Sequence, residues 1–260
     1  MTLDDILEQT QWDTFWLPSD ATAIDRDDVL YLRSPRDDGY LNTVLRVRAD
    51  ESALPALIRE VDEAHRAVRS RWMLAAKSRH PALPALLTAT GYSITHEHHA
   101  YTVDVSEYAV RATPGVVAHA VETLDDLRDV LSVTDRAFDR AHHGDDSTLR
   151  AELDACTRPG ARVRRFVVRD EHTGNALSAG GMNVYPALRF GFLWAGGTVP
   201  EARRRGAYTA LVGARVIEAR RLGLTHVGLY GRVDTSAPIV EAQGFTRGGP
   251  MTYWERPPHG

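Results

Sequence analysis

Short apolar runs alternate with longer segments of helical periodicity along most of the chain. Apolar runs of about four to eight residues are typical of strands, and apolar residues spaced three and four apart are typical of helices. The expected strands are residues 28–34, 41–49, 71–77, 97–105, 164–170, 176–186, 189–199, 225–233 and 251–257. The expected helices lie within residues 51–70, 81–93, 123–138, 147–157, 198–223 and 236–245. This alternation predicts an α/β protein.

The stretch from Arg111 to Gly115 carries turn residues without periodicity, so we predict a domain boundary there. The predicted domains are residues 1–112 and 116–260, and a chain of 260 residues is long enough for both. The two halves look like distant copies. A strand ending near Val47 or Val199 is followed by a helix, a strand and a short helix ending in glycine and an aromatic residue, at intervals that agree to within one residue. Chance similarity between two α/β halves is the alternative.

Three arginines and a glycine, residues 203–206, separate an apolar strand from the helix expected within residues 198–223. The first turn of a helix exposes free N–H groups and carries a partial positive charge. Gly206 lets a ligand approach the backbone, and arginine binds phosphate with two hydrogen bonds. We therefore predict a diphosphate-binding loop, with a solvated basic surface as the plainer alternative.

The first half of the chain differs at the corresponding place. Its sequence there, RADESALP at residues 48–55, has one arginine, two acidic residues and no glycine, so it would repel a diphosphate. In the second half, Leu211, Ala214 and Ile217 fall on one face of the helix that follows the loop, which predicts its apolar face. Gly223 is expected to end that helix.

Composition narrows the class of protein. The chain is 43% hydrophobic and 25% charged, as is typical of a soluble globular protein. A net charge of −4 gives no sign of a nucleic-acid-binding surface, and Cys156 is the only cysteine, so no intramolecular disulfide forms. The acidic start of the chain is unlike a signal peptide, and no apolar run reaches the length of a membrane span. We expect a cytoplasmic protein with no membrane partner and no nucleic-acid partner.

The loop and the later helix together resemble the GNAT superfamily of acyl-CoA-dependent acyltransferases. The signature of that superfamily is a strand, then Arg/Gln-x-x-Gly-x-Gly/Ala, then a helix. Here it reads Arg203 to Tyr208, with Tyr208 in place of the last small residue. A helix ending in Leu-Tyr-x-x-x-Gly-Phe often follows, and here residues 239–245 read IVEAQGF. The resemblance spans residues 116–257. It implies two tandem GNAT-like domains, each a mixed, mostly antiparallel sheet flanked by helices, of which the first is degenerate and has lost the coenzyme loop.

The resemblance also implies a site for acetyl-CoA or another acyl-CoA as co-substrate, without a metal. Main-chain N–H groups from Arg204 to Thr209 would hold the diphosphate, and main chain near Val199 would pair with pantetheine like an added strand. Backbone groups near Ala195 to Gly197 would stabilise the oxyanion. The implied coenzyme-binding residues are Thr198, Val199, Arg203, Arg204, Arg205, Gly206, Ala207, Tyr208 and Thr209. Plainer alternatives are a simple bulge at the two glycines and a local hydrogen bond of the Thr209 hydroxyl.

The sequence does not identify the group that would protonate the departing thiolate. Many members of the superfamily use a tyrosine four residues before the glycine of Gly-Phe, but Val240 stands there and has no proton to donate. Tyr208, Ser236 or a water molecule could replace it. For the general base, His143 and Asp145, between the first two helices of the second half, are candidates with His142 and Asp146, although Asp146 also suits a helix N-cap.

The histidine run and the single cysteine give little support for a metal site or a cysteine nucleophile. The run from His96 to His99 puts two histidines on one face of a strand without a carboxylate, which is weak support for a metal site. Cys156 is expected to be a buried apolar residue rather than a nucleophile. The resulting hypothesis is acetyl transfer from acetyl-CoA to a primary amine of a small molecule by a monomer or homodimer. The alternatives are a non-catalytic acyl-CoA-binding sensor or assembly protein, and transfer to an amine of a protein. The sequence does not specify the acceptor or the acyl chain length.

Overall fold

The computed structural model describes residues 1–139 and 146–259. It divides into two compact units. The first comprises Met1–Tyr101, Tyr230–Pro238 and Arg247–Gly260, and the second comprises Thr102–Leu229 and Ile239–Thr246. The C-terminal end of the chain thus belongs to the unit that contains the N-terminus. The stretch at residues 111–115, where the sequence predicts a domain boundary, lies within the second unit.

The first unit contains most of a mixed sheet and the helices beside it. Its strands are β1 (Thr22–Asp25), β2 (Val29–Arg33), β3 (Thr43–Val47), β4 (Ser70–Leu74), β5 (Ser93–Asp104) and β11 (Thr246–Arg256), although the end of β5 and the first residue of β11 fall in the second unit. Its helices are α1 (Leu3–Gln9), α2 (Leu54–Ala64) and α3 (Leu83–Ala89), with a 3-10 turn, η1, at Glu51–Ala53. The pair β3–β4 is parallel, whereas β1–β2, β2–β3 and β4–β11 are antiparallel.

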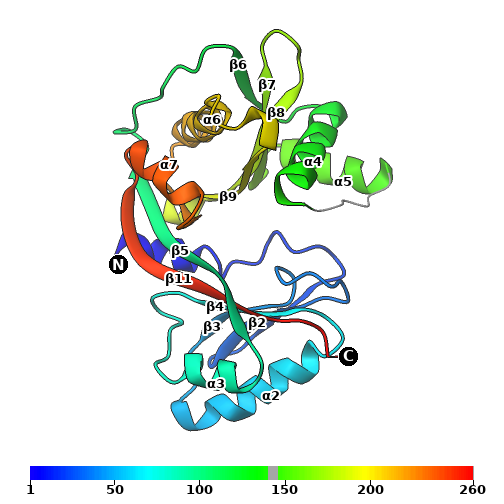
Figure 1. Ribbon diagram of the computed structural model, residues 1–260, viewed down its shortest axis with the longest axis vertical. Helices are drawn as coiled ribbons and strands as arrows, with labels where there is room; N and C mark the ends of the chain where they lie inside the picture. The colour runs from blue at the N-terminus through cyan, green and yellow to red at the C-terminus, as the bar shows by residue number, and fades with distance from the viewer. Residues whose placement is uncertain (140–145, 260) are drawn as a thin grey trace. The chain divides into compact units, whose positions relative to one another are not determined.

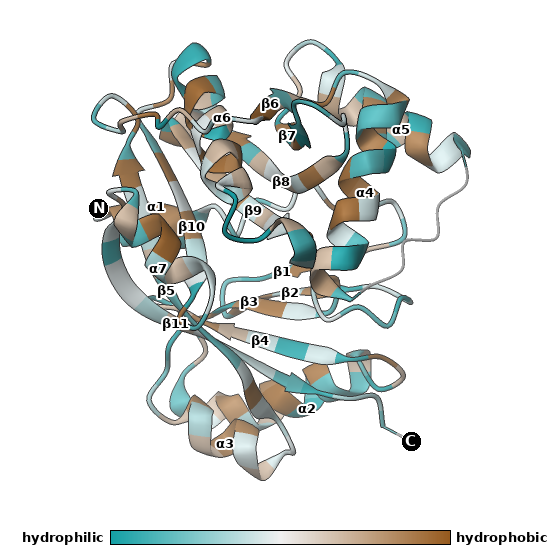
Figure 2. Cartoon of the chain, turned by 45° about the horizontal axis from the view of Figure 1, so that its top comes forward, coloured by the Kyte–Doolittle hydropathy of each residue, from teal (hydrophilic) through white to brown (hydrophobic). Residues whose placement is uncertain are grey.

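The first unit has apolar side chains on both sides of its sheet. In one cluster, apolar side chains of α2 and α3 pack together with the fully buried Trp72 of β4. A second cluster lies around Leu45 and Met73 and includes Trp12 and Trp16 from the segment after α1. Figure 2 shows hydrophobic and hydrophilic residues mixed along α2, as expected of a helix with one face on a sheet.

The second unit contains the other strands in the order β10–β9–β8–β7–β6. They are β6 (Val116–Ala120), β7 (Val163–Asp170), β8 (Ala176–Tyr185), β9 (Phe190–Thr198) and β10 (His226–Arg232), and the last residues of β10 fall in the first unit. The helices are α4 (Leu124–Phe138), α5 (Asp146–Thr157), α6 (Ala207–Arg221) and α7 (Ser236–Ala242), with 3-10 turns η2 (Pro186–Leu188) and η3 (Pro200–Ala202). The first three residues of α7 fall in the first unit. Only β9–β10 is parallel among the described pairs of this unit.

Helices α4 and α6 cover opposite faces of the sheet strands of the second unit. A side chain at Gly197 would meet Ala137 of α4, whereas one at the preceding Gly196 would meet Tyr208 of α6. Successive residues of a strand point to opposite faces, so the two helices lie on either side of β9. Figure 1 shows the same arrangement around β8.

The α/β class and the mixed, mostly antiparallel sheets are confirmed. The sequence did not predict α1, β1 or β6. The helix expected over residues 51–70 is shorter, because it starts as η1 and α2 ends at Ala64. In α6 the expected apolar face is partly wrong: Leu211 is buried, but Ile217 is 51% exposed. The buried residues of α6 are instead Ala207, Leu211, Val212, Gly213, Arg215, Val216 and Ala219.

Candidate functional site

Strand β9 carries a bulge near its C-terminal end. Gly181 pairs with Trp194 and Ala179 with Gly197, so Gly180 stands opposite two residues, Ala195 and Gly196. Ala195 has a φ of 46°, which is rare for a residue with a side chain. Bulges and positive φ angles interrupt regular pairing and are frequent beside functional sites. The bulge thus takes the main chain of Ala195 and Gly196, two residues of the expected oxyanion-stabilising segment Ala195 to Gly197, out of the regular ladder.

Beyond its first three residues, β9 separates from its parallel neighbour. The two strands pair over Phe190–Phe192 and His226–Gly228, although β9 continues to Thr198. Residues 193–198 therefore form an edge of β9 that is not paired with β10, which we call the open edge. Such an edge accepts an extended ligand through main-chain hydrogen bonds.

The end of the open edge is already held to β8. The N–H of Val199 donates to the carbonyl of Leu177 at 3.0 Å. The Ser178 hydroxyl donates to the carbonyl of Gly197 at 2.7 Å and lies 3.0 Å from the hydroxyl of Thr198. The N–H of Val199, one of the expected pantetheine-pairing groups, thus has a partner within the chain.

The loop between β9 and α6 depends on glycine at Gly206. Its φ of 80° is disfavoured for other residues, and a Cβ there would lie 2.4 Å from Cγ2 of Thr113. Arg204 also has a positive φ, of 64°. The loop therefore turns sharply into α6 at Gly206, which is half-buried.

The N-terminus of α6 has free hydrogen-bond donors. Within the described part of the chain, no main-chain N–H from Arg204 to Thr209 donates to a protein group, and the first helical bond runs from Ala210 N–H to the Gly206 carbonyl at 3.0 Å. The hydroxyl of Thr209 likewise has no protein partner among these residues, and the side chain of Ala207 is buried. These donors stand at the positive end of a helix of four turns, so they suit an anion.

The three loop arginines differ in their partners. Arg205 forms an ion pair of 2.7 Å with Asp170. The carboxylate of Asp170 accepts hydrogen bonds from Arg205 and from the N–H groups of Thr173 and His172, which together lower its pKa to about 2. Arg203 and Arg204 are exposed and form no ion pair with any residue that the structure describes. Two cations and six N–H donors are thus available to an anion at this loop.

The proposed proton-transfer residues do not all lie together. Tyr208, in the first turn of α6, lies against Gly196 of the bulge. Ser236 belongs to the first unit, and its hydroxyl accepts the N–H of Arg232 at 2.9 Å. Val240 is fully buried in α7. His142, His143 and Asp145 lie outside the described residues, and Asp146 pairs with Arg128 at 3.1 Å.

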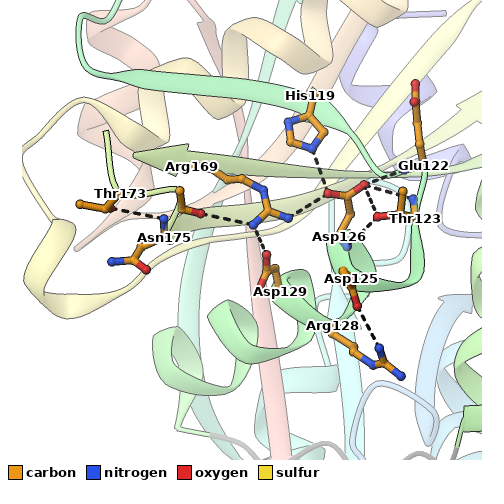
Figure 3. Close-up of polar contacts among 11 residues, drawn as sticks. His119, Glu122, Thr123, Asp125, Asp126, Arg128, Asp129, Arg169, Thr173 and Asn175 are labelled. Carbon is orange, nitrogen blue, oxygen red and sulfur yellow. Dashed lines mark hydrogen bonds and ion pairs between the residues drawn. The ribbon is translucent and has the colours of Figure 1, made fainter. Parts of the chain in front are cut away.

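A second polar cluster, drawn in Figure 3, lies at the start of α4. Asp126 is 2.9 Å from Arg169 and 3.1 Å from His119, and it closes a capping box with Thr123. Burial opposes ionisation of Asp126, but the hydrogen bonds from His119, Arg169 and Thr123 lower its pKa overall. Both carboxylate oxygens are engaged, so this cluster joins α4 to β6 and β7.

The first unit repeats the bulge and the separated parallel pair. The pairing of β2 with β3 skips Leu45, and β3 pairs with β4 only at Thr43 and Val44. The carbonyl of Leu45 accepts the indole N–H of Trp12 and the hydroxyl of Ser78, both at 3.2 Å. The edge of β3 beyond Val44 corresponds to the open edge of β9. In the first unit, the segment after α1 covers this edge.

Further contacts fix this N-terminal segment. The guanidinium carbon of Arg46 lies 5.7 Å from a ring centroid of Trp12, and that of Arg48 lies 5.3 Å from a ring centroid of the same residue. The buried carboxylate of Glu8 accepts the N–H of Lys77 and the hydroxyl of Ser78, each at 2.7 Å. The first unit thus combines an acidic loop with an edge that its own chain already occupies.

We expect Trp12→Ala to lower the free energy of unfolding by about 2 kcal/mol, because it removes a half-buried ring and one hydrogen bond to Leu45. Trp12→Phe keeps most of the ring and should cost about 1 kcal/mol. Urea unfolding measures both. Equal stability of Trp12→Ala and the unchanged protein would show that the segment is not held there.

Two kinds of feature are absent from the described residues. No group of three or more His, Cys, Asp or Glu side chains in residues 1–139 and 146–259 is placed to hold a metal ion. In the same residues, no helix has the length and apolar character needed to cross a membrane.

Sequence comparison finds no matching family model and no matching curated protein. Similar solved structures are found. A GCN5-related N-acetyltransferase from Kribbella flavida is 16% identical, with a TM-score of 0.74 over 99% of this chain and 96% of that one. A GCN5-related N-acetyltransferase from Sphaerobacter thermophilus is 15% identical, with a TM-score of 0.62 over 98% and 85%. A tandem GNAT protein from the clavulanic acid biosynthesis pathway is 12% identical, with a TM-score of 0.62 over 96% and 87%. These likenesses confirm the predicted GNAT fold over nearly the whole chain.

Proposed function

We propose that this chain, which has the GNAT fold, is an acyl-CoA-dependent N-acyltransferase whose coenzyme site lies in the second unit. The observation that carries the proposal is the loop before α6, where six main-chain N–H groups and two arginines have no partner among the described residues. A glycine whose Cβ would meet Thr113 keeps that loop in its shape. The preferred reaction is acetyl transfer from acetyl-CoA to a primary amine of a small molecule.

The residues of the second unit have separate roles in this reaction. Arg203, Arg204 and the N–H groups at the start of α6 bind the diphosphate, and the open edge of β9 holds the pantetheine arm. Bound acyl-CoA supplies a thioester carbonyl that a neutral amine attacks directly. Main-chain donors at the bulge, Ala195 to Gly197, stabilise the negative charge that develops on the carbonyl oxygen.

Protons must balance in this transfer, since the amine nitrogen loses one and the sulfur gains one. Tyr208 is the proposed donor to sulfur, because it is the hydroxyl in the first turn of α6 that lies against the bulge. Ser236 is a weaker choice, since its hydroxyl already accepts the N–H of Arg232. His143 and Asp145 stay candidates for the base that takes the amine proton.

A second function, acyl-CoA binding without turnover, is favoured by one observation. The position at which many GNAT enzymes carry a tyrosine is Val240, which is fully buried and has no proton to donate. A sensor or assembly protein would retain the coenzyme loop and need no donor. A cytoplasmic location, and a monomer or homodimer, remain predictions with either function.

Coenzyme A is expected to stabilise the protein. At about a hundred times its dissociation constant it should add roughly 2.7 kcal/mol, which corresponds to a rise in Tm of about 5–10 °C. A thermal-shift titration measures this, with pantetheine as the control because it lacks the diphosphate. The absence of any shift at millimolar coenzyme A would remove both proposed functions.

The enzyme and the sensor are separated by thiol release. An enzyme given acetyl-CoA and a panel of amino acids, polyamines and aminoglycosides should release free thiol with at least one acceptor. Tm shifts without thiol release from any acceptor would favour the sensor.

A further inference from the structure

The buried face of α6 carries an arginine. Arg215 is 1% exposed and lies among Leu211, Val212 and Val216. Its Nε donates to the carbonyl of Leu211 and its Nη1 to the carbonyl of Gly181, both at 3.3 Å. Its Nη2 is buried and has no hydrogen-bond partner among the described residues. A buried donor without an acceptor is costly, so this group calls for an explanation.

The charge of Arg215 also lacks a counterion. No carboxylate that the structure describes forms an ion pair with it, and burial lowers the pKa of Arg215. Two neighbouring tyrosines, Tyr208 and Tyr108, oppose this effect and raise the pKa of Arg215. The hydroxyl of Tyr108 donates to Gln243 at 2.7 Å, whereas Tyr208 is the tyrosine whose side chain interacts with the guanidinium of Arg215.

Gly196 of the bulge is where Tyr208 and Arg215 converge. A Cβ on Gly196 would lie 3.2 Å from the hydroxyl oxygen of Tyr208 and 3.3 Å from Nη2 of Arg215. It would also lie 2.9 Å from the ring of Tyr208, so any larger residue would displace that ring. Gly196 therefore allows Tyr208 to stand where the GNAT signature has a small residue, with its hydroxyl beside the guanidinium.

Hydrogen-bond chemistry then fixes the direction of the tyrosine proton. A guanidinium only donates, so in a hydrogen bond between these two groups the oxygen of Tyr208 accepts from Nη2 and its own O–H points elsewhere. We propose that Arg215 is a positioning residue that holds the Tyr208 hydroxyl as a hydrogen-bond donor to the coenzyme sulfur. This inference rests on the proposed coenzyme site, and it assigns Arg215 a role in acyl transfer.

The proton transfer balances as follows. The amine nitrogen forms a bond to the thioester carbon, the C–S bond breaks, and its electron pair goes to sulfur. The O–H proton of Tyr208 moves to that sulfur and gives the free thiol. The proton lost by the amine nitrogen, relayed by water, restores the Tyr208 hydroxyl. The positive charge of Arg215 stabilises the transient phenolate of Tyr208. A neutral residue at position 215 would stabilise that phenolate less and would therefore slow the proton transfer.

The test combines kinetics with a binding measurement. Tyr208→Phe should lower kcat by about a hundredfold and Arg215→Met by about tenfold, while coenzyme A affinity falls by no more than about tenfold. The double variant should be no slower than Tyr208→Phe alone, because Arg215 acts through the missing hydroxyl. Arg215→Lys should recover part of the loss, since it keeps the charge. Arg220→Met is the matched control: Arg220 lies on the same helix and also donates to main-chain carbonyls, of Val105 and Tyr108.

The binding arm uses coenzyme A and desulfo-coenzyme A. A hydroxyl that donates to sulfur gives a preference for coenzyme A of about tenfold, roughly the effect of one hydrogen bond. That preference should fall equally in Tyr208→Phe and Arg215→Met and persist in Arg220→Met. Additive kinetic losses, or a preference unchanged in Arg215→Met, would overturn the role of Arg215 while leaving the proposed function in place. Failure of the unchanged protein to bind coenzyme A would instead overturn the proposed function and this inference together.

Discussion

Reversing the charges of Arg203 and Arg204 together is expected to weaken coenzyme A binding by at least about a hundredfold. Each arginine can donate charge-assisted hydrogen bonds worth roughly 1.5–3 kcal/mol, and glutamates at the same positions would repel a diphosphate. Both side chains are exposed and free of ion pairs with the described residues, so Arg203→Glu/Arg204→Glu should keep the fold. Titration calorimetry with coenzyme A measures the change, and the Tm without ligand shows whether folding is intact.

Two control variants locate this effect. Arg150→Glu reverses the charge of another exposed arginine in the second unit, and Glu51→Gln alters the corresponding loop of the first unit. Neither should change the affinity by more than about twofold, because neither side chain belongs to the loop and salt screens exposed charges that do not contact the ligand. A comparable loss in Arg150→Glu would mean that only the net charge matters. Gly206→Glu is a poorer test, since its Cβ would collide with Thr113.

The coenzyme loop could be predicted because its chemistry lies in consecutive residues. Gly206 between arginines and a helix is visible in the sequence, and the structure adds the φ angles and the contact with Thr113 that require a glycine there. The strand that precedes the loop was predicted to within a residue at each end, whereas its bulge was not specified. A bulge depends on the register with β8, which is a long-range property that local periodicity does not contain.

The features that the sequence did not predict depend on packing between distant segments. Trp12 covers Leu45 because the segment after α1 folds onto β3, and no local pattern near residue 12 indicates that contact. The sequence does not single out Arg215, because helical spacing favours Leu211, Ala214 and Ile217 as the apolar face of α6. The available signal was an arginine between Leu211, Val212 and Val216, at helical spacing on an apolar stripe, which is an unusual position for a charge.

Val240→Tyr, which would install the tyrosine found in many GNAT enzymes, is expected to destabilise this protein rather than to improve it. Val240 is 0% exposed, so a phenol ring must force its neighbours apart and bury a hydroxyl. Overpacking costs typically about 1–3 kcal/mol and a buried unpaired hydroxyl about 1–3 kcal/mol more. For a chain of this size the sum corresponds to a fall in Tm of roughly 10 °C.

Ile239→Tyr is the matched control, because Ile239 precedes Val240 on α7 and is 40% exposed. It adds the same ring to the same helix and should change Tm by less than about 2 °C, as exposed substitutions usually do. Differential scanning calorimetry compares the two, and thiol release from acetyl-CoA reports turnover. A Val240→Tyr protein that is as stable as Ile239→Tyr and turns over faster would show that the residue 240 side chain reaches the reacting sulfur. In that case Val240, and not Tyr208 held by Arg215, would mark the place of the proton donor.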